Sequence, residues 1–157
     1  MWSRSISCML GLLLEPGSEL VPKLNVALNV ANDFSAGAWA DNARTVSFTI
    51  PKTALSKACP GARDESLSVC APGEHYVVET RMTAPGMPYG SSWYVDEQLV
   101  ITADSRGDPG RCRVLISSEV VFTKKVMAKK MLLAGFKKDL KKTFAKYVPV
   151  VEGHLAG

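Results

Sequence analysis

The chain has 157 residues, of which 46% are hydrophobic and 22% are charged, and its formal net charge is +4. This composition is typical of one globular domain and excludes a disordered chain, and no apolar run approaches the roughly twenty residues needed to cross a bilayer. The charge is uneven, because residues 111–146 hold two arginines and nine lysines against two acids, a net of +9, and the remainder carries −5. An anionic surface, either a membrane or a nucleic acid, is therefore the expected partner.

The N-terminal stretch has two interpretations. Its short apolar run over residues 6–14 is typical either of a weak signal peptide or of an amphipathic helix that ends at Pro16 and Gly17. The helix is favoured, because Ser7 and Cys8 interrupt the run and no small-residue cleavage site follows.

A second helix is predicted over residues 19–31, with Ser18 as its N-cap and Pro22 in its first turn. A weak strand is expected over residues 33–40. The stretch "RTVSFTIP", residues 44–51, alternates cleanly between apolar and polar side chains and predicts a stronger strand that ends at the proline.

The next part of the chain contains the remaining strands. Residues 52–73 are expected to be mostly loop around "CPGARD", with a strand only near residues 65–70. Further strands are predicted over "HYVVETRM" (75–82), over residues 87–104 after a proline–glycine turn (84–90), and over "RCRVLISSEVVF" (111–122) after the hairpin turn "SRGDPG".

One acid interrupts the apolar face of the strand at residues 87–104. Trp93, Val95, Leu99 and Ile101 share that face by period-two alternation, and Glu97 falls among them. A buried, unpaired carboxylate costs several kcal/mol, so Glu97 must be hydrogen-bonded, paired with a lysine or arginine, or turned to solvent.

The sequence changes period after the last strand. From residue 124 to 148, apolar residues recur at steps of mostly three and four, which predicts a long amphipathic helix. Its apolar stripe is expected to cover the sheet, and its lysines form either a solvated face or a surface that docks on membranes. Residues 149–157 are expected to be a frayed tail.

The four cysteines do not indicate a metal site. Cys8, Cys59, Cys70 and Cys112 lack a C-x-x-C spacing and have only two histidines to assist them. A loop closed by Cys59 and Cys70 is permitted by the even count, but a cytosolic protein would keep both thiols reduced. Cys112 lies in a strand pattern and is predicted to be a small buried hydrophobe.

Antiparallel strands followed by one long helix predict an α+β helix-grip fold, in which a curved sheet wraps the helix around an apolar cavity. Four blocks, "RTVSFTIP", "HYVVETRM", "PYGSSWYVDEQLVI" and "EVVFTKKVMAKKMLLAGFKKDLKKTF", resemble in order and spacing the VASt domain. This is the StAR-related lipid-transfer-like domain of the Aster and Lam sterol transporters and of plant VAD1-type proteins. "LLLEPGSEL" and "DFSAGAW" resemble its first helix and strand, so the resemblance covers roughly residues 10–148 of a single domain, 1–157.

The chain also departs from that family. Residues 52–73 match poorly, and they include the region where the family carries a mobile loop over the cavity mouth. The GRAM domain that often precedes a VASt domain and the transmembrane helix that often follows it are missing. The expectation is an excised domain or a free-standing soluble carrier.

The resemblance implies binding of a sterol or similar apolar lipid and its non-vesicular transfer between membranes, for instance at membrane contact sites. Such a carrier needs a dry cavity, an entrance and one or two polar groups for the sterol hydroxyl. The inward-facing residues are the candidates for ligand binding, with Glu97 as the polar contact: Phe48, Ile50, Tyr76, Val78, Trp93, Val95, Glu97, Leu99, Ile101, Val114, Ile116, Val120, Leu132 and Phe136. Each is alternatively a simple core residue.

The candidates for membrane docking are the helix lysines, because each lysine near an anionic surface contributes about 1 kcal/mol before screening by salt. They are Lys124, Lys125, Lys129, Lys130, Lys137, Lys138, Lys141 and Lys142. No exposed aromatic residues are expected among them for stacking on bases, so nucleic acid is not the expected partner.

Enzymatic interpretations find little support. His75 and His154 lack a nucleophile or carboxylate at a recognisable spacing, and the chain contains no glycine-rich phosphate loop, GxSxG or HExxH motif. The prediction is a cytoplasmic, peripheral, monomeric lipid carrier with no catalytic residues, no metal and no cofactor. A ligand-free interaction module of the same fold, or a cavity enzyme that uses Glu97 or His75 as a base, is the alternative.

Overall fold

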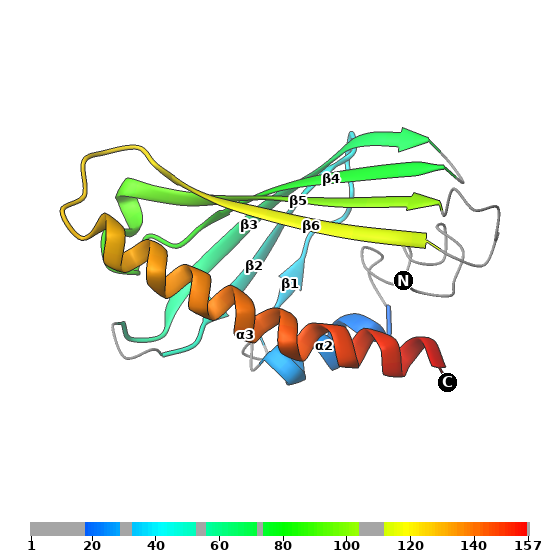
Figure 1. Ribbon diagram of the computed structural model, residues 1–157. Coiled ribbons are helices and arrows are strands. Elements are labelled where there is room, and N and C mark those ends of the chain that lie inside the picture. Colours follow the sequence, from blue (N-terminus) through cyan, green and yellow to red (C-terminus); the bar gives the residue numbers. More distant parts are fainter. Residues whose placement is uncertain (1–17, 29–32, 53–55, 72–73, 104–111, 157) are drawn as a thin grey trace.

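The computed structural model describes residues 18–28, 33–52, 56–71, 74–103 and 112–156. These residues form one six-stranded antiparallel sheet with its strands in sequence order, and a long helix crosses one face of the twisted sheet (Figure 1). The elements are α2 (Leu20–Leu28), β1 (Ser35–Ala36), β2 (Ala43–Ile50), β3 (Cys59–Ala71), β4 (His75–Thr83), η1 (Gly90–Ser92), β5 (Trp93–Ala103), β6 (Cys112–Phe122) and α3 (Lys129–Ala156). This α+β helix-grip arrangement confirms the predicted fold class.

The strands predicted from alternation lie close to their expected positions. β2, β4 and β6 begin and end within about two residues of the predicted bounds. β5 ends as predicted but starts later, at Trp93, because the turn before it continues through η1. In β1 only Ser35 and Ala36 pair with β2, so the predicted strand 33–40 is mostly irregular.

The strand predicted near residues 65–70 lies within a longer one, because Cys59 to Ala71 form the 13-residue strand β3, and the loop expected around "CPGARD" was wrong. Pro60 is tolerated since β3 pairs with β4 only from Ala62 onward, so Pro60 has a neighbouring strand on one side alone. A side chain at position 61 would be crowded, because a Cβ atom on Gly61 would lie 3.0 Å from the Phe48 ring of β2. Proline and glycine were therefore misleading signals of a turn.

Helix α2 begins as predicted. The backbone N–H of Leu20 donates to Ser18 Oγ at 3.2 Å, which is the contact expected of an N-cap. Its described part is Leu20–Leu28, and residues 29–31 of the predicted range lie outside the described residues. The predicted helix at residues 6–14 and the hairpin turn at residues 105–110 lie outside the described residues.

Helix α3 differs from the prediction at both ends. It starts at Lys129 instead of 124, because Val126 turns inward and is only 8% exposed. It also continues through Pro149 to Ala156, so the expected frayed tail is helical. Val151 explains the extension, since its side chain is fully buried and burial offsets the hydrogen bond that Pro149 removes.

Two separate hydrophobic clusters connect the helices to the sheet. The α2 cluster lies where α2, α3 and the sheet meet, and it consists of Leu20, Leu24, Tyr76, Ile101, Cys112 and Val151. The Trp93 cluster lies at the start of α3 and consists of Ala84, Trp93, Val95, Val126 and Leu132. The molecule therefore has two packed ends beneath one sheet.

Two cysteines, Cys59 and Cys112, are buried. Cys112 is fully buried in the α2 cluster, which confirms its prediction as a small hydrophobe. Cys59 is a free, buried thiol, and Cys70 lies at the far end of the same strand β3. Because a strand rises about 3.3 Å per residue, the two cannot approach within disulfide distance, and the permitted Cys59–Cys70 loop is excluded.

Candidate functional site

The predicted ligand-binding residues all lie on the side of the sheet that α3 covers, or on α3 itself. Alternation fixes this placement, because Trp93 and Val95 of β5 pack with Leu132 of α3, and residues two apart share a face. The set divides by burial. Buried are Tyr76, Val78, Trp93, Val95, Ile101 and Leu132; half-buried are Phe48, Ile50, Glu97, Leu99, Val114, Ile116, Val120 and Phe136.

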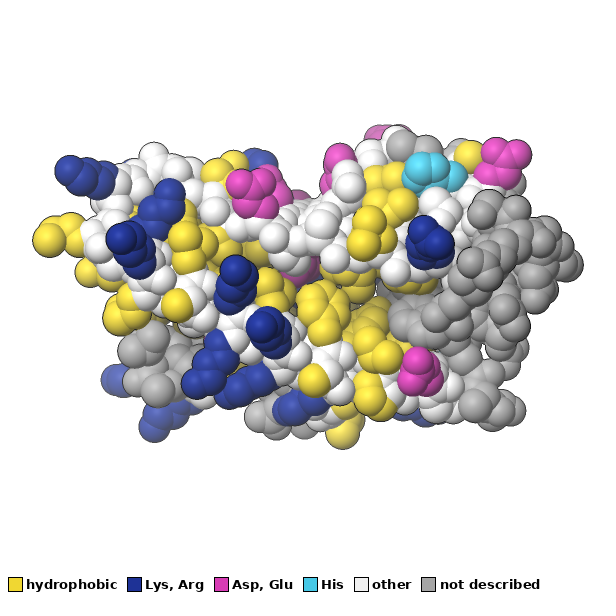
Figure 2. All heavy atoms as spheres, in the orientation of Figure 1, with side chains coloured by type: hydrophobic (Ala, Val, Ile, Leu, Met, Phe, Trp, Pro, Cys, Tyr) yellow, Lys and Arg dark blue, Asp and Glu magenta, His cyan; other side chains and the backbone are white. Residues whose placement is uncertain are grey.

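The half-buried residues indicate that the space between sheet and α3 is incompletely filled. Side chains that face a covering helix in a close-packed core are almost wholly buried. Leu99, Ile116 and Phe136 face inward and yet retain accessible surface, as do Leu140 and Phe144 further along α3. Hydrophobic side chains are visible where β6 and α3 border the front of the molecule (Figure 2).

A row of polar residues crosses this inward face between the two hydrophobic clusters. The register pairs each member directly with the next across five neighbouring strands. We call it the polar row, and its members are Arg44, Glu65, Thr80, Glu97 and Ser118. The inward face is thus apolar at both ends and polar in the middle.

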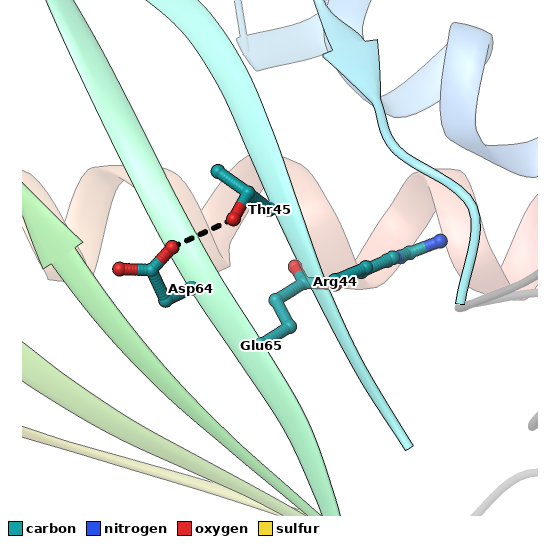
Figure 3. Close-up of polar contacts among 4 residues, drawn as sticks. All are labelled: Arg44, Thr45, Asp64 and Glu65. Atoms are coloured by element: carbon teal, nitrogen blue, oxygen red, sulfur yellow. Dashed lines mark hydrogen bonds and ion pairs between the residues drawn. The ribbon is translucent and has the colours of Figure 1, made fainter. Parts of the chain in front are cut away.

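The first ion pair of this region is tight and closed. Arg44 Nε lies 2.7 Å from Glu65 Oε2, and the two side chains are 6% and 11% exposed. The Arg44 guanidinium also stacks 4.5 Å from the centroid of the Trp39 ring. Figure 3 shows this pair beside Thr45 and Asp64, which are bonded to each other on the opposite face of β2 and β3.

The second ion pair is looser and more accessible. Arg63 lies two residues from Glu65 along β3, and its Nη2 is 3.7 Å from Glu97 Oε2. The two side chains are 38% and 21% exposed. The hydroxyl of Ser118 donates to Glu97 Oε1 at 3.2 Å. Glu97 is therefore paired with an arginine and hydrogen-bonded, one of the arrangements expected for an acid on an apolar face.

Tyr147 of α3 is half-buried and packs against the α2 cluster. Burial raises the pKa of its hydroxyl to about 12, and the positive charge of Arg63 acts in the opposite direction. The phenol is therefore neutral at physiological pH.

A hollow of about 1120 Å³ is lined by outward-facing residues of the sheet and also by all five members of the polar row. Its side chains are polar, and Asp64, Glu79 and Asp96 are among them. Figure 2 shows the depression over the sheet, between two groups of acidic side chains. It is not the apolar cavity expected between sheet and helix, because an acidic, open surface offers no burial to an apolar ligand.

All eight lysines predicted to dock on membranes are exposed. Two exposed methionines accompany those near the start of α3: the side chain of Met127 is 98% exposed and that of Met131 is 58% exposed. Lys129 Nζ lies 5.0 Å from the centroid of the Phe122 ring. Basic and apolar groups are therefore presented together at this end of the helix.

Several inward-facing residues were missed by sequence reasoning. Arg63 was missed because its segment was interpreted as loop, and Glu65 because alternation was not applied to the short strand expected near residues 65–70. Arg44 has the same parity as Val46 in β2, and Thr80 the same parity as Tyr76 in β4, so a signal existed for both. Leu140, Phe144 and Tyr147 belong to the recognised helix stripe but were not proposed as lining.

The two histidines lie apart from the polar row. His154 Nδ1 is 3.1 Å from Lys23 Nζ, which joins α3 to α2. His75 begins β4, next to the α2 cluster residue Tyr76. Within the described parts of the chain, no three His, Cys, Asp or Glu side chains are grouped as a metal site would require.

Among the described helices, none combines the length and the apolar character that a membrane span requires.

A twisted antiparallel sheet gripped against a long C-terminal helix, with an inward face that is apolar at both ends, defines the class of StART-like domains. Residues 5–139 match the family model described as "VAD1 Analog of StAR-related lipid transfer domain", VASt. The chain belongs to the VASt family, a family of lipid-binding domains, as the resemblance predicted.

A solved structure shows the same fold. The chain is similar to a conserved protein from Geobacillus kaustophilus, whose crystal structure aligns with a TM-score of 0.55 at 15% identity over 99% of this chain and 90% of that one. At this identity the likeness concerns the fold alone. No curated protein was found to match the chain.

Proposed function

We propose that this domain binds one molecule of sterol, or of a similar apolar lipid, between the sheet and α3 and transfers it between membranes. The observation that carries the proposal is the incomplete burial of inward-facing apolar side chains such as Leu99, Ile116 and Phe136. The chain belongs to a family of lipid-binding domains, and a bound lipid would cover this accessible apolar surface. Sterol transfer needs neither a cofactor nor bond breaking, so we propose a monomeric carrier that is not an enzyme and works at the cytoplasmic surface of membranes.

The physical basis is the transfer of apolar surface out of water. A sterol is almost wholly hydrophobic, and burying apolar area stabilises it by roughly 25 cal/mol per Å². The half-buried residues of β5, β6 and α3 offer a surface that a lipid would cover.

Titration with a fluorescent sterol tests this function. We expect saturable binding with a stoichiometry of one, and thermal stabilisation of the protein by the ligand, because binding to the folded state alone shifts unfolding by mass action. A folded protein that shows no saturable binding would contradict the proposal and favour a ligand-free interaction module. Consumption of the bound lipid would indicate an enzyme instead.

Membrane docking is expected to depend on the first turns of α3. Replacing Lys129 and Lys130 by glutamine should weaken binding to phosphatidylserine vesicles about thirtyfold, since each lysine near such a surface contributes about 1 kcal/mol. We expect the start of α3 to dock because Met127 and Met131 are exposed beside these lysines. Vesicle sedimentation at two salt concentrations measures the effect, which salt should reduce.

The matched control is the double substitution of Lys141 and Lys142, which lie on the same helix and are equally charged. It should weaken vesicle binding less. Equal losses from both double variants would show that the helix docks along its whole length. Binding that ignores both salt and phosphatidylserine content would mean that the lysines only solubilise the helix.

A further inference from the structure

The two edges of the described sheet differ in how they are protected. One edge is β1, which is only two residues long. The other edge is β6, which runs for 11 residues and borders the front of the sheet in Figure 1. β6 contains no lysine or proline, and its pairing with β5 shows no bulge. Short strands, lysines, prolines and bulges are the usual protections of an edge, so β6 offers an open template for a further strand.

The backbone groups that β6 presents at this edge follow from its hydrogen bonds to β5. The N–H of Thr123 donates to the carbonyl of Ser92 at 2.9 Å, and these two residues continue the register between β5 and β6. In an antiparallel pair the direction of bonding alternates along the strand. The odd-numbered residues of β6 therefore bond to β5, whereas Val114, Ile116 and Ser118 point their N–H and C=O groups away from the sheet.

Two charged side chains of β6 are available for a partner on this edge. Arg113 and Glu119 are exposed, and neither side chain forms an ion pair or a hydrogen bond with another described residue. Glu119 lies opposite Asp96 of β5, whose carboxylate is already bound by Arg81. Like charges directly opposite each other on a sheet are unfavourable, so Glu119 would gain from a cation on its free side.

We propose that the free edge of β6 pairs with the β6 edge of a second copy of this chain, antiparallel and about a two-fold axis at Ile116. The outward-pointing N–H and C=O groups of Ile116 then bond to those of Ile116 in the second copy. Val114 of each copy bonds to Ser118 of the other, and the two sheets become one. Such an association is closed, because a two-fold axis brings each surface against its own counterpart.

The side chains select this register. Arg113 lies directly opposite Glu119 of the second copy, and the symmetry forms this ion pair twice. A shift by two residues would set Arg113 opposite Ser117 or Val121, which are uncharged, and a shift by one residue would turn the inward face outward. Leu115, which is 60% exposed, lies diagonally across from Leu115 of the second copy. Both the charges and the exposed leucine therefore find partners in one register.

The contact is small, because it consists of one strand from each copy. Small specific interfaces are transient, so we expect a dissociation constant on the order of 100 μM. A monomeric carrier at low concentration and a pair of chains at high concentration are therefore compatible.

The first test uses the wild-type protein. Between about 5 and 500 μM, its sedimentation coefficient should rise from that of a monomer toward that of a dimer, with no larger species, because a two-fold contact closes. Over the same range, hydrogen exchange of the Val114, Ile116 and Ser118 amides should slow. The amides of Arg113 and Leu115 already bond to β5, so their exchange should change little.

Charge reversal then identifies the register. Arg113→Glu leaves two acids on each copy at the contact, and Glu119→Arg leaves two bases, so either change should weaken pairing about thirtyfold. The double variant restores opposite charges and should pair as tightly as the wild type. An equimolar mixture of the two single variants should also pair, as a heterodimer.

Glu79→Arg is the matched control, because Glu79 is exposed on β4, two strands from this edge. The same reversal there should leave pairing unchanged, and thermal unfolding of every variant shows whether it is folded. A wild type that stays monomeric would overturn the pairing. Edge amides whose exchange ignores concentration, single variants that pair normally, or a folded double variant that does not pair would overturn it as well. None of these measurements involves lipid, so each outcome leaves the proposed lipid binding to its own test.

Discussion

A Val151→Asp substitution is expected to lower the free energy of unfolding by about 3–5 kcal/mol, the typical cost of leaving one buried charge unpaired. Val151 is fully buried in the α2 cluster, where Leu20 and Leu24 of α2 cover it. For a domain of this size the loss corresponds to a fall in melting temperature of roughly 6–20 °C. Thermal unfolding followed by circular dichroism measures it.

Val148→Asp is the matched control for this prediction. It makes the same change three residues earlier on α3, at a side chain that is 38% exposed. It should cost less than about 1 kcal/mol, as surface substitutions usually do. Equal stability of the two variants would show that the end of α3 does not pack on α2 in solution.

A Trp93→Ala substitution is expected to cost about 3–5 kcal/mol of stability while changing lipid affinity little in the molecules that remain folded. Trp93 is only 4% exposed, and its ring meets Phe136 edge-on with the centroids 4.8 Å apart. Its indole N–H donates to the carbonyl of Pro88 at 3.1 Å. The Trp93 ring and its N–H group therefore already have partners within the protein, and we expect Trp93 to stabilise the core and not to contact the lipid.

Trp93→Leu should show the same pattern with a smaller stability loss, because leucine leaves a smaller cavity. Ile116→Ala provides the contrast, since Ile116 faces inward on β6 and is half-buried. It should reduce sterol affinity more than stability. If Trp93→Leu instead lowers the affinity of a stable protein, Trp93 lines the lipid site. Melting temperature and sterol affinity are measured on the same samples.

Most of the sheet follows from the sequence because alternation is a local property. Val46, Phe48 and Ile50 recur at every second residue, and burial of one face of β2 requires nothing more distant. β3 could not be recognised in this way. Pro60 and Gly61 usually end strands, and they are tolerated only because β4 pairs with β3 beyond them and because β2 side chains occupy the space beside Gly61.

The candidate site was predictable in part. Alternation placed the apolar lining and Glu97 on one face, and these residues do lie on the side that α3 covers. Alternation did not distinguish Trp93, which is buried in the Trp93 cluster, from Leu99, which is only half-buried. That difference depends on where α3 lies over the sheet and how closely its side chains approach.

The sequence by itself determined the α+β class, the period of each strand and of α3, and membership of the VASt family. Only the tertiary structure decided two features. The polar row joins Arg44, Glu65, Thr80, Glu97 and Ser118, which are far apart in the chain and meet because the strand register sets them opposite one another. The last turns of α3 exist past Pro149 because Val151 is buried against α2, from the other end of the chain. Both depend on contacts between distant segments, which local propensity does not encode.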